Sequence, residues 1–443
     1  MDNARLSAPN WFHPSRRSYR FTILLFVSLL TFGSYFAYDS VGAIAPTLIE
    51  QLGLGRESIG QMYTLYSVAA ILSVFIGGLL IDRIGTRRAS FLFSLLVTLG
   101  AAVVAFAPNV WVLYAGRFIF GWGSESLVVA QSAIFARWFK GKELAFSFGV
   151  GLTISRLGTL FSFNTEALIA EYFGNYRYAL WAAVLFCGVS LLANIVYILL
   201  DRRGENILAL KDEGGGDAIV VADIKKFNPS YWYVTLLCLT FYSAIFPFTA
   251  LSTDFFNTKW GLPLIAGSGG GFFAQVFDNI LHMFSTAGGT TTIIIFASMV
   301  LAPFFGRLVD KYGHRASIMM VGSLLMIPAF LTMAFTMIPP AIPMVVLGAA
   351  FVMVPAAMWP SVPLIVEKNR VGTAFGLMTM VQNIGLALFP WLNGLLRDVT
   401  KEYTASMVMF SMLGIVGFVF AVLLIRADRR EGGRLERVEL KNV

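Results

Sequence analysis

The chain has 443 residues, of which 57% are hydrophobic and 13% charged, and its mean hydropathy is +0.73. An ordinary soluble domain carries about 25% charged residues, so a water-soluble protein is excluded and lipid must surround most of this chain. The net charge is +8, but the basic residues flank apolar segments, which indicates membrane orientation and not nucleic-acid binding.

The apolar segments predict an all-α membrane protein with twelve spanning helices, because each crossing needs about 20 apolar residues. In chain order the spans are expected at 19–47, 58–82, 88–107, 110–136, 144–171, 176–200, 230–256, 286–307, 315–337, 340–366, 371–396 and 402–426. The polar stretch 201–228 predicts a cytoplasmic linker between two six-helix bundles, at 19–200 and 229–427. The tails 1–18 and 428–443 complete the chain.

The positions of Lys and Arg predict that both termini are cytoplasmic. Five of the 33 basic residues fall in expected outer segments and two, Arg117 and Arg156, fall inside spans. The other 26 lie on the inner side. A bias of this size also favours an even number of spans.

Segment 261–285, between the seventh and eighth spans, departs from this pattern. It is rich in glycine at first and then apolar, with Asp278 and His282 among the apolar residues. We expect an outer loop with a short interfacial helix. A longer, broken eighth span is the alternative.

The two halves repeat a loop motif that follows the second and the eighth span. In the first half its residues are Gly78, Asp82, Arg83, Gly85, Arg87 and Arg88. In the second half the motif is reduced, with Asp310 and Arg315 at the matching positions and Asp310 lying 228 residues after Asp82. Repeated halves place a substrate site at their interface, near the middle of the membrane. We expect the motif to act as a conformational latch; the alternative is that its arginines serve only to orient the chain.

Charged residues inside spans are informative because each costs roughly 2.5–3.5 kcal/mol on insertion scales. Glu125 stands about 15 residues from the outer end of the fourth span, or roughly 22 Å. Arg156 stands about 12 residues from the inner end of the fifth span, or roughly 18 Å, so the two should lie at similar depth on adjacent helices. They either form a structural salt bridge or face a central cavity, where Glu125 would accept an ammonium and Arg156 would hold a carboxylate.

Three other intramembrane charges remain open in role. Arg117, earlier in the fourth span, suits packing or coupling, and Asp39 can titrate or bond to the neighbouring tyrosines Tyr35 and Tyr38. Glu166 lies near the outer end of its span, where we expect it to be solvated.

Aromatic and amide side chains add candidate cavity linings. Tyr242 and Phe246 accompany Pro247, which we expect to interrupt the seventh span, and Trp359 precedes Pro360 in the tenth. Gln382 and Asn383 place polar groups in the eleventh span, and Asn383 matches Arg156 in the repeat.

Several chemistries lack their residues. No phosphate-binding glycine motif or Ser-His-Asp set is found, the two cysteines lie in apolar runs, and the three histidines are scattered. We therefore expect no enzyme, no cofactor and no metal site.

These stretches resemble the major facilitator superfamily, and within it the branch of lysosomal dipeptide transporters and their bacterial relatives. The most specific stretch is 138–144, with the sequence Trp-Phe-Lys-Gly-Lys-Glu-Leu. The other matching stretches are 33–39, 116–127, 155–158, 246–248, 359–360, 372–376 and 382–383.

The resemblance implies facilitated transport of dipeptides by alternating access, without ion coupling. It implies that Glu125 binds the peptide amine and Arg156 the peptide carboxylate. The chain lacks an acidic dileucine signal and outer Asn-x-Ser/Thr acceptors, so we expect a bacterial inner membrane and a monomer. A transporter of another organic anion is the first alternative, and a non-transporting scaffold or receptor is the second.

Overall fold

The computed structural model describes residues 13–139, 143–208, 221–267, 270–367 and 370–437. Most of the predicted N-terminal tail, part of the linker, the loop residues 140–142 and the last six residues lie outside this part. The described residues fold almost entirely into helices. Their bounds are α1 Arg17–Leu29, α2 Phe32–Ala43, α3 Ala45–Leu52, α4 Arg56–Phe106, α5 Val110–Phe139, α6 Leu144–Tyr172, α7 Tyr176–Leu208, η1 Val221–Lys226, α8 Pro229–Trp260, α9 Phe272–Leu281, η2 Met283–Ser285, α10 Ala287–Tyr312, α11 Arg315–Phe335, α12 Ala341–Ile365, α13 Val371–Thr400 and α14 Thr404–Arg430.

Eleven helices of the described chain are long and apolar enough to cross a membrane, when α1 and α2 are counted as one span. The helix α4 has 51 residues and would be about 76 Å long if straight, more than twice the hydrocarbon thickness of a bilayer. It turns back at Gly85, whose φ of 81° and ψ of 159° are accessible to glycine alone. A Cβ on Gly121 of α5 would meet Tyr66, and one on Gly123 would meet Val97, so both legs of α4 pack beside α5. The fold therefore has the twelve crossings that the sequence predicts.

The end of the sixth span, the continuity of the first span and two predicted breaks differ from the structure. The sixth span was expected to end at residue 200, but α7 continues to Leu208 because Asp201 is buried and accepts bonds from Arg137 and Trp138 at 3.0 and 2.6 Å. The first span divides into α1 and α2. Pro247 and Pro360 do not interrupt their helices, since both lie inside the continuous helices α8 and α12. The carbonyl of Pro247 accepts a hydrogen bond from Asn393 of α13 at 2.8 Å.

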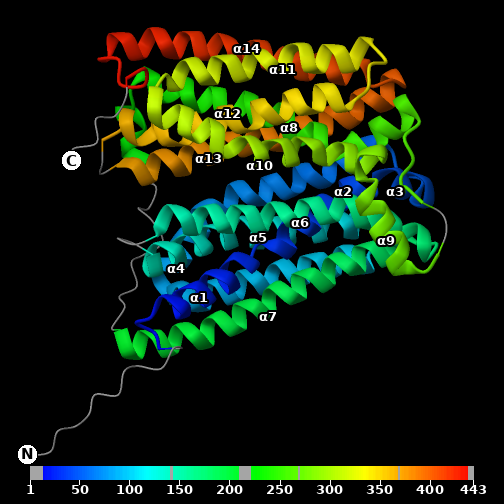
Figure 1. Cartoon of the computed structure of the whole chain (residues 1–443), viewed down its shortest axis with the longest axis horizontal. Coiled ribbons are helices and arrows are strands. Elements are labelled where there is room, and N and C mark those ends of the chain that lie inside the picture. The colour runs from blue at the N-terminus through cyan, green and yellow to red at the C-terminus, as the bar shows by residue number, and fades with distance from the viewer. Residues whose placement is uncertain (1–12, 140–142, 209–220, 268–269, 368–369, 438–443) are drawn as a thin grey trace, which may run out of the picture.

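Segment 261–285 contains the separate short helix α9, and α10 begins only at Ala287. Helix α9 lies at the end of the molecule that also carries α3 (Figure 1). We call this the outer end, after the predicted topology. The described chain begins, at α1, and ends, after α14, at the opposite end, which we call the inner end.

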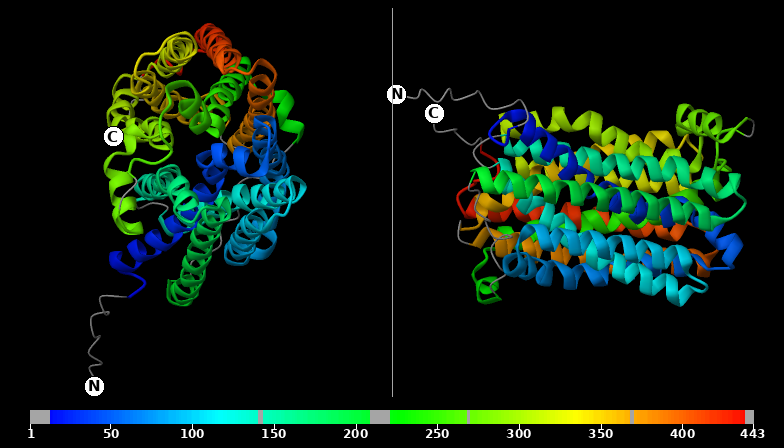
Figure 2. Two further views of the ribbon diagram at one scale, coloured as in Figure 1. Left: turned by 90° about the vertical axis from the view of Figure 1, so that its right-hand side faces the viewer. Right: turned by 90° about the horizontal axis from the view of Figure 1, so that it is seen from below.

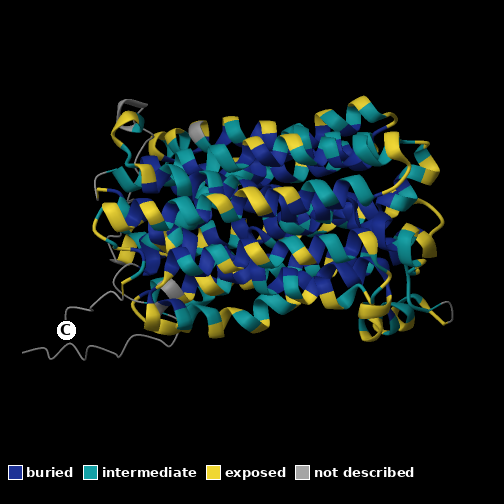
Figure 3. Ribbon diagram, turned by 90° about the horizontal axis from the view of Figure 1, so that it is seen from above, coloured by how far each residue is buried: buried dark blue, intermediate teal, exposed yellow. Residues whose placement is uncertain are grey.

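The helices run roughly parallel and form two bundles, α1–α7 and α8–α14, as the two further views show (Figure 2). Buried residues fill the interior of the bundles, and exposed residues mark their periphery and both ends (Figure 3). Large apolar side chains are exposed on that periphery, among them Leu185 at 65% and Phe304 at 61%. This is the pattern of a protein with lipid as its solvent.

The two bundles approach each other most closely where the outer part of α4 meets α13. A Cβ on Gly60 would lie 2.1 Å from the carbonyl oxygen of Pro390, and one on Gly394 would lie 2.2 Å from that of Arg56. Only glycine permits this backbone approach. The contact closes the outer end of the interface between the halves.

Candidate substrate-binding site

Glu125 lies on α5 and is half-buried. The Tyr66 hydroxyl, from the first leg of α4, lies 2.7 Å from its Oε1 and 3.1 Å from Oγ of Ser124. Ser124 in turn shares a 2.5 Å hydrogen bond with Ser34 of α2. These contacts fix the carboxylate on the N-terminal half and leave its second oxygen without a protein donor in the described part of the chain.

Arg156 lies on α6 and is also half-buried. Its guanidinium carbon stands 4.6 Å from the centre of the Phe351 ring, which belongs to α12 in the other half. Among the described residues it has no hydrogen bond or ion pair, and its nitrogens are not enclosed. Glu125 and Arg156 are therefore not joined in a salt bridge, and each keeps polar capacity for a further partner.

Tyr35 and Asp39, one turn apart on α2, lie within electrostatic range of this pair. Tyr35 is half-buried and interacts electrostatically with Arg156, Glu125 and Asp39. Asp39 is buried against the Thr159 hydroxyl and near the guanidinium groups of Arg156 and Arg117. Tyr35 therefore lies near two carboxyl groups and one guanidinium group.

Arg117 is buried at 1% exposure and is enclosed by aromatic rings. Its guanidinium donates to the backbone carbonyls of Ala37 and Tyr38 in α2, at 3.1 and 3.3 Å. The carbon at its centre lies 4.9–5.5 Å from four ring centres, those of Tyr38, Tyr63, Tyr66 and Phe120. These contacts support the packing role among the two roles considered, because Arg117 links α5, α4 and α2.

The C-terminal half contributes an aromatic cluster from α8 and α12. Tyr242 and Phe246 stack at 5.7 Å, and Phe246 meets Phe351 edge-on at 5.8 Å. The Trp359 indole donates to the Tyr242 hydroxyl at 3.1 Å. Since Arg156 lies over the Phe351 ring, the structure brings this predicted aromatic set close to Arg156.

The two amides of α13 differ in their environment. Gln382 is half-buried and lies 3.5 Å from the thiol of Cys238 on α8. Asn383 is buried and donates at 3.0 Å to the carbonyl of Thr379 in its own helix. The Asn383 amide is therefore occupied by a hydrogen bond within α13. Gln382 is the better placed of the two to contact a substrate.

The latch motif makes its described ion pairs within the N-terminal half. Arg87 pairs with Asp201 at 3.3 Å and with Glu205, and Arg137 also bonds Asp201. Arg83 and Arg88 are exposed. A Cβ on Gly78 would meet nothing within 4 Å, so no described neighbouring helix packs closely against this glycine in this structure. Arg315 is buried at the start of α11, and the side chain of Asp310 lies outside the described set.

A polar network joins the halves at the outer end. Arg56 of α4 makes a two-point ion pair with the buried Asp254 of α8, at 2.9 and 3.1 Å, and the Tyr403 hydroxyl donates to Asp254 at 2.5 Å. The backbone N–H of Glu57 donates to Asp398 at 2.8 Å. We call Arg56, Glu57, Asp254, Asp398 and Tyr403 the outer lock.

The expected solvation of Glu166 is wrong. This residue is fully buried, and within the described part of the chain neither carboxyl oxygen has a hydrogen-bond partner. It lies near Tyr63 and Cys187, which belong to α4 and α7. Depth along its own helix predicted water, but the neighbouring helices cover the site.

Sequence reasoning missed three sets of contacts at these sites. Tyr66 and Phe351 are two of the aromatic residues of a chain with 40 Phe and 15 Tyr, and no motif in the sequence marks them as partners of the two charges. The outer lock had a usable signal, because Asp254 is an acidic residue inside a predicted span and Arg56 is one of few outer cations. Pairing them requires knowing that α4 and α8 meet.

A family model described as Major Facilitator Superfamily matches residues 27–280 and 270–442. The chain belongs to this superfamily and is a multi-pass membrane transporter.

Its relatives include the lysosomal dipeptide transporter MFSD1 of Danio rerio, 32% identical, with 95% of this chain and 90% of the relative covered. MFSD1 of Homo sapiens is 31% identical, with 97% and 91% covered. A solved structure of a bacterial homolog to the human lysosomal transporter Spinster, inward-facing and unoccupied, matches with a TM-score of 0.71 and 13% identity, over 94% of this chain and 98% of that one. This last likeness shows the fold alone.

Proposed function

We propose that the protein carries dipeptides or similar small zwitterions by facilitated diffusion, through alternating access of a site between its halves. The observation that supports this most is the separation of Glu125 from Arg156. Each holds an unneutralised charge at half-buried depth, and a zwitterion would neutralise both at once. The dipeptide transporters related to this chain support the same substrate class.

In this proposal Glu125, oriented by Tyr66, accepts the ammonium of the peptide, and Arg156 presents its two-point fork to the carboxylate. Binding would draw Arg156 away from Phe351. Tyr35, Tyr38, Tyr242, Phe246 and Trp359 would then line the space for peptide side chains, with Gln382 and Asn383 as polar lining and Asp39 beside Arg156. Aromatic walls that lack a fixed polar pattern suit a carrier of broad specificity.

The test is dipeptide counterflow in liposomes with the variants Glu125→Gln and Arg156→Ala. We expect at least a tenfold loss for each, since a charge-assisted hydrogen bond contributes about 1.5–3 kcal/mol. Arg203→Ala, at an exposed position of α7, is the control and should transport normally. Normal counterflow by both site variants would overturn the proposal.

Blocked substrates separate the two ends of the site. An N-acetylated dipeptide has no ammonium for Glu125 to bind. It should therefore bind the Glu125→Gln variant as well as it binds the unaltered protein. A C-terminally amidated dipeptide should behave in the same way with Arg156→Ala. Loss of transport in Arg156→Ala alone would indicate an organic-anion carrier.

We also propose that both termini are cytoplasmic, on the strength of the basic inner segments, and that the protein is a monomer in a bacterial inner membrane, since it lacks the dileucine and Asn-x-Ser/Thr signals noted above. Cysteine introduced at Glu402 should react with an impermeant maleimide on intact cells, and cysteine at Arg429 should react only after lysis. Both native cysteines are buried, which keeps the background low. The reverse labelling pattern would overturn this topology.

A further inference from the structure

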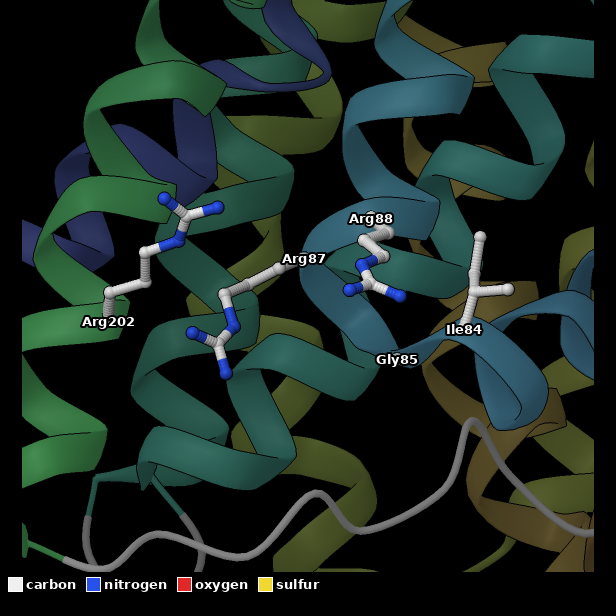
Figure 4. A pocket seen from close by; sticks show the side chains of 5 residues that line it. All are labelled: Ile84, Gly85, Arg87, Arg88 and Arg202. Atoms are coloured by element: carbon white, nitrogen blue, oxygen red, sulfur yellow. The ribbon is translucent and has the colours of Figure 1, made fainter.

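A cationic cavity at the inner end takes no part in the proposed substrate site. Its volume is about 280 Å³, and it is lined by Ile84, Gly85, Arg87, Arg88 and Arg202. The first four belong to the turn of α4, and Arg202 comes from the end of α7. Three guanidinium groups lie around the same hollow (Figure 4).

The charges around this cavity do not balance. Arg87 and Arg137 are paired with Asp201 and Glu205, which makes these four residues a neutral set. Arg88 and Arg202 are exposed, and neither has an ion pair among the described residues. Two positive charges therefore remain on one cavity with no carboxylate of the described chain to offset them.

Each of these two arginines lies on the same helix face as an exposed apolar side chain. Phe91, three residues after Arg88, is 39% exposed, and Leu199, three residues before Arg202, is 60% exposed. Residues three apart on a helix share a face, so each arginine marks the border where an apolar face ends. An amphipathic ligand bound there would contact the arginines with its polar group and the exposed apolar side chains with its apolar part.

We propose that Arg88 and Arg202, with Arg87 beside them, bind the phosphate group of an anionic phospholipid of the adjoining leaflet. The arginine fork matches phosphate oxygens in a two-point geometry. The acyl chains would run along Phe91 and Leu199. Basic cavities at the cytoplasmic ends of membrane helices suit anionic head groups, and the cytoplasmic leaflet supplies them. Free inorganic phosphate could make the same contacts with the arginines, but it has no acyl chains to pack along Phe91 and Leu199.

The experiment measures binding of phosphatidylglycerol to the full-length protein in detergent, by native mass spectrometry and by the shift in melting temperature. Phosphatidylcholine and inorganic phosphate serve as the two comparison ligands. The test variant is the pair Arg88→Gln with Arg202→Gln. One matched control is Arg203→Gln, the next residue on α7, which is exposed but does not line the cavity. The other is Arg429→Gln with Arg430→Gln, which removes the same charge from exposed positions at the end of α14.

We expect saturable binding of phosphatidylglycerol that weakens about fivefold for each arginine removed, so roughly 25-fold in the test variant. The controls should stay within about twofold of the unaltered protein. Should the test variant fail to fold, Arg88→Lys with Arg202→Lys keeps the charge but loses the planar fork, and its affinity should still fall severalfold.

Equal binding of phosphatidylglycerol by the test variant and the controls would overturn the proposal. So would equal stabilisation by phosphatidylcholine, or stabilisation by inorganic phosphate with none by the lipid. The outcome does not depend on which solute the central site carries.

Discussion

Two buried ionisable side chains of the N-terminal half, Arg117 and Glu166, differ in the partners that surround them. Arg117 is surrounded by four aromatic rings and donates to two backbone carbonyls, so its cation is compensated where it lies. Glu166 is enclosed as completely, but no described residue donates to either of its oxygens. An isolated carboxylate in such a place costs several kcal/mol.

Glu166→Gln should therefore leave the protein folded, with an unchanged or higher melting temperature in detergent at neutral pH. The amide has nearly the same shape as the acid and carries no charge that needs compensation. Differential scanning fluorimetry measures the effect, with Arg117→Gln as the contrasting variant. That variant loses the cation that the rings enclose and should melt well below the unaltered protein. A large destabilisation by Glu166→Gln would show that the carboxylate has an ionic partner.

At the site, the charged residues were predictable from the sequence, but their partners were not. Helical rise predicts matching heights for Glu125 and Arg156, and the structure brings both within electrostatic range of Tyr35. Which side chain contacts each of them depends on how α4 and α12 turn relative to α5 and α6. Tyr66 and Phe351 hold those places, and each is one of many aromatic residues in the predicted spans.

Among the elements, α4 shows how one residue decides a topology. Its two legs form one run in the chain and would continue as a single rod without the turn at Gly85. The motif around Gly85 predicted a loop between two spans. The structure shortens that loop to one glycine, which occupies a region of φ and ψ that side chains with a Cβ rarely enter.

Gly85→Ala should destabilise the protein by about 1–3 kcal/mol and lower the yield of folded transporter. Gly78→Ala provides the matched control, because Gly78 is helical and has open space around it. Alanine there should be neutral or stabilising by about 1 kcal/mol, as expected for an exposed helix. Monodispersity in size-exclusion chromatography and the melting temperature report both effects. Equal behaviour of the two variants would contradict the assigned role of Gly85.

At the scale of the whole molecule, the halves are held together at the outer end by the outer lock and by glycine-mediated contact between α4 and α13. The ion pair of Arg56 with Asp254 is partly shielded, since the Asp254 side chain is 3% exposed and that of Arg56 is 23% exposed. Removing one partner of such a pair leaves the other charge uncompensated, which destabilises the closed arrangement more than the pair itself stabilises it. Twelve spans in two repeated halves were predictable from hydropathy and motif spacing. The outer closure was not, because it depends on contacts between residues some 200 to 340 positions apart.

Asp254→Asn should shift the population toward conformations that are open at the outer end. Thr64→Cys provides the reporter, since Thr64 is half-buried and donates to the carbonyl of Ala387 across the interface, so parting of the halves should expose it further. We expect several-fold faster labelling by an impermeant maleimide in the Asp254→Asn background. The matched control is Glu402→Gln, at an exposed outer position. Unchanged labelling would mean that the outer lock does not hold this end closed.

The contact of Arg156 with Phe351 bears on how an unloaded carrier returns. A strict exchanger must not reorient without bound solute. An uncompensated charge in the substrate-free site commonly prevents this, because burying it costs free energy. If Arg156 binds the solute carboxylate as proposed, the Phe351 ring of the opposite bundle offers the guanidinium a weaker partner, at about 0.5–2 kcal/mol, which an anion easily exceeds. This contact would lower the electrostatic cost of reorientation without solute, and we expect net downhill flux as well as one-for-one exchange.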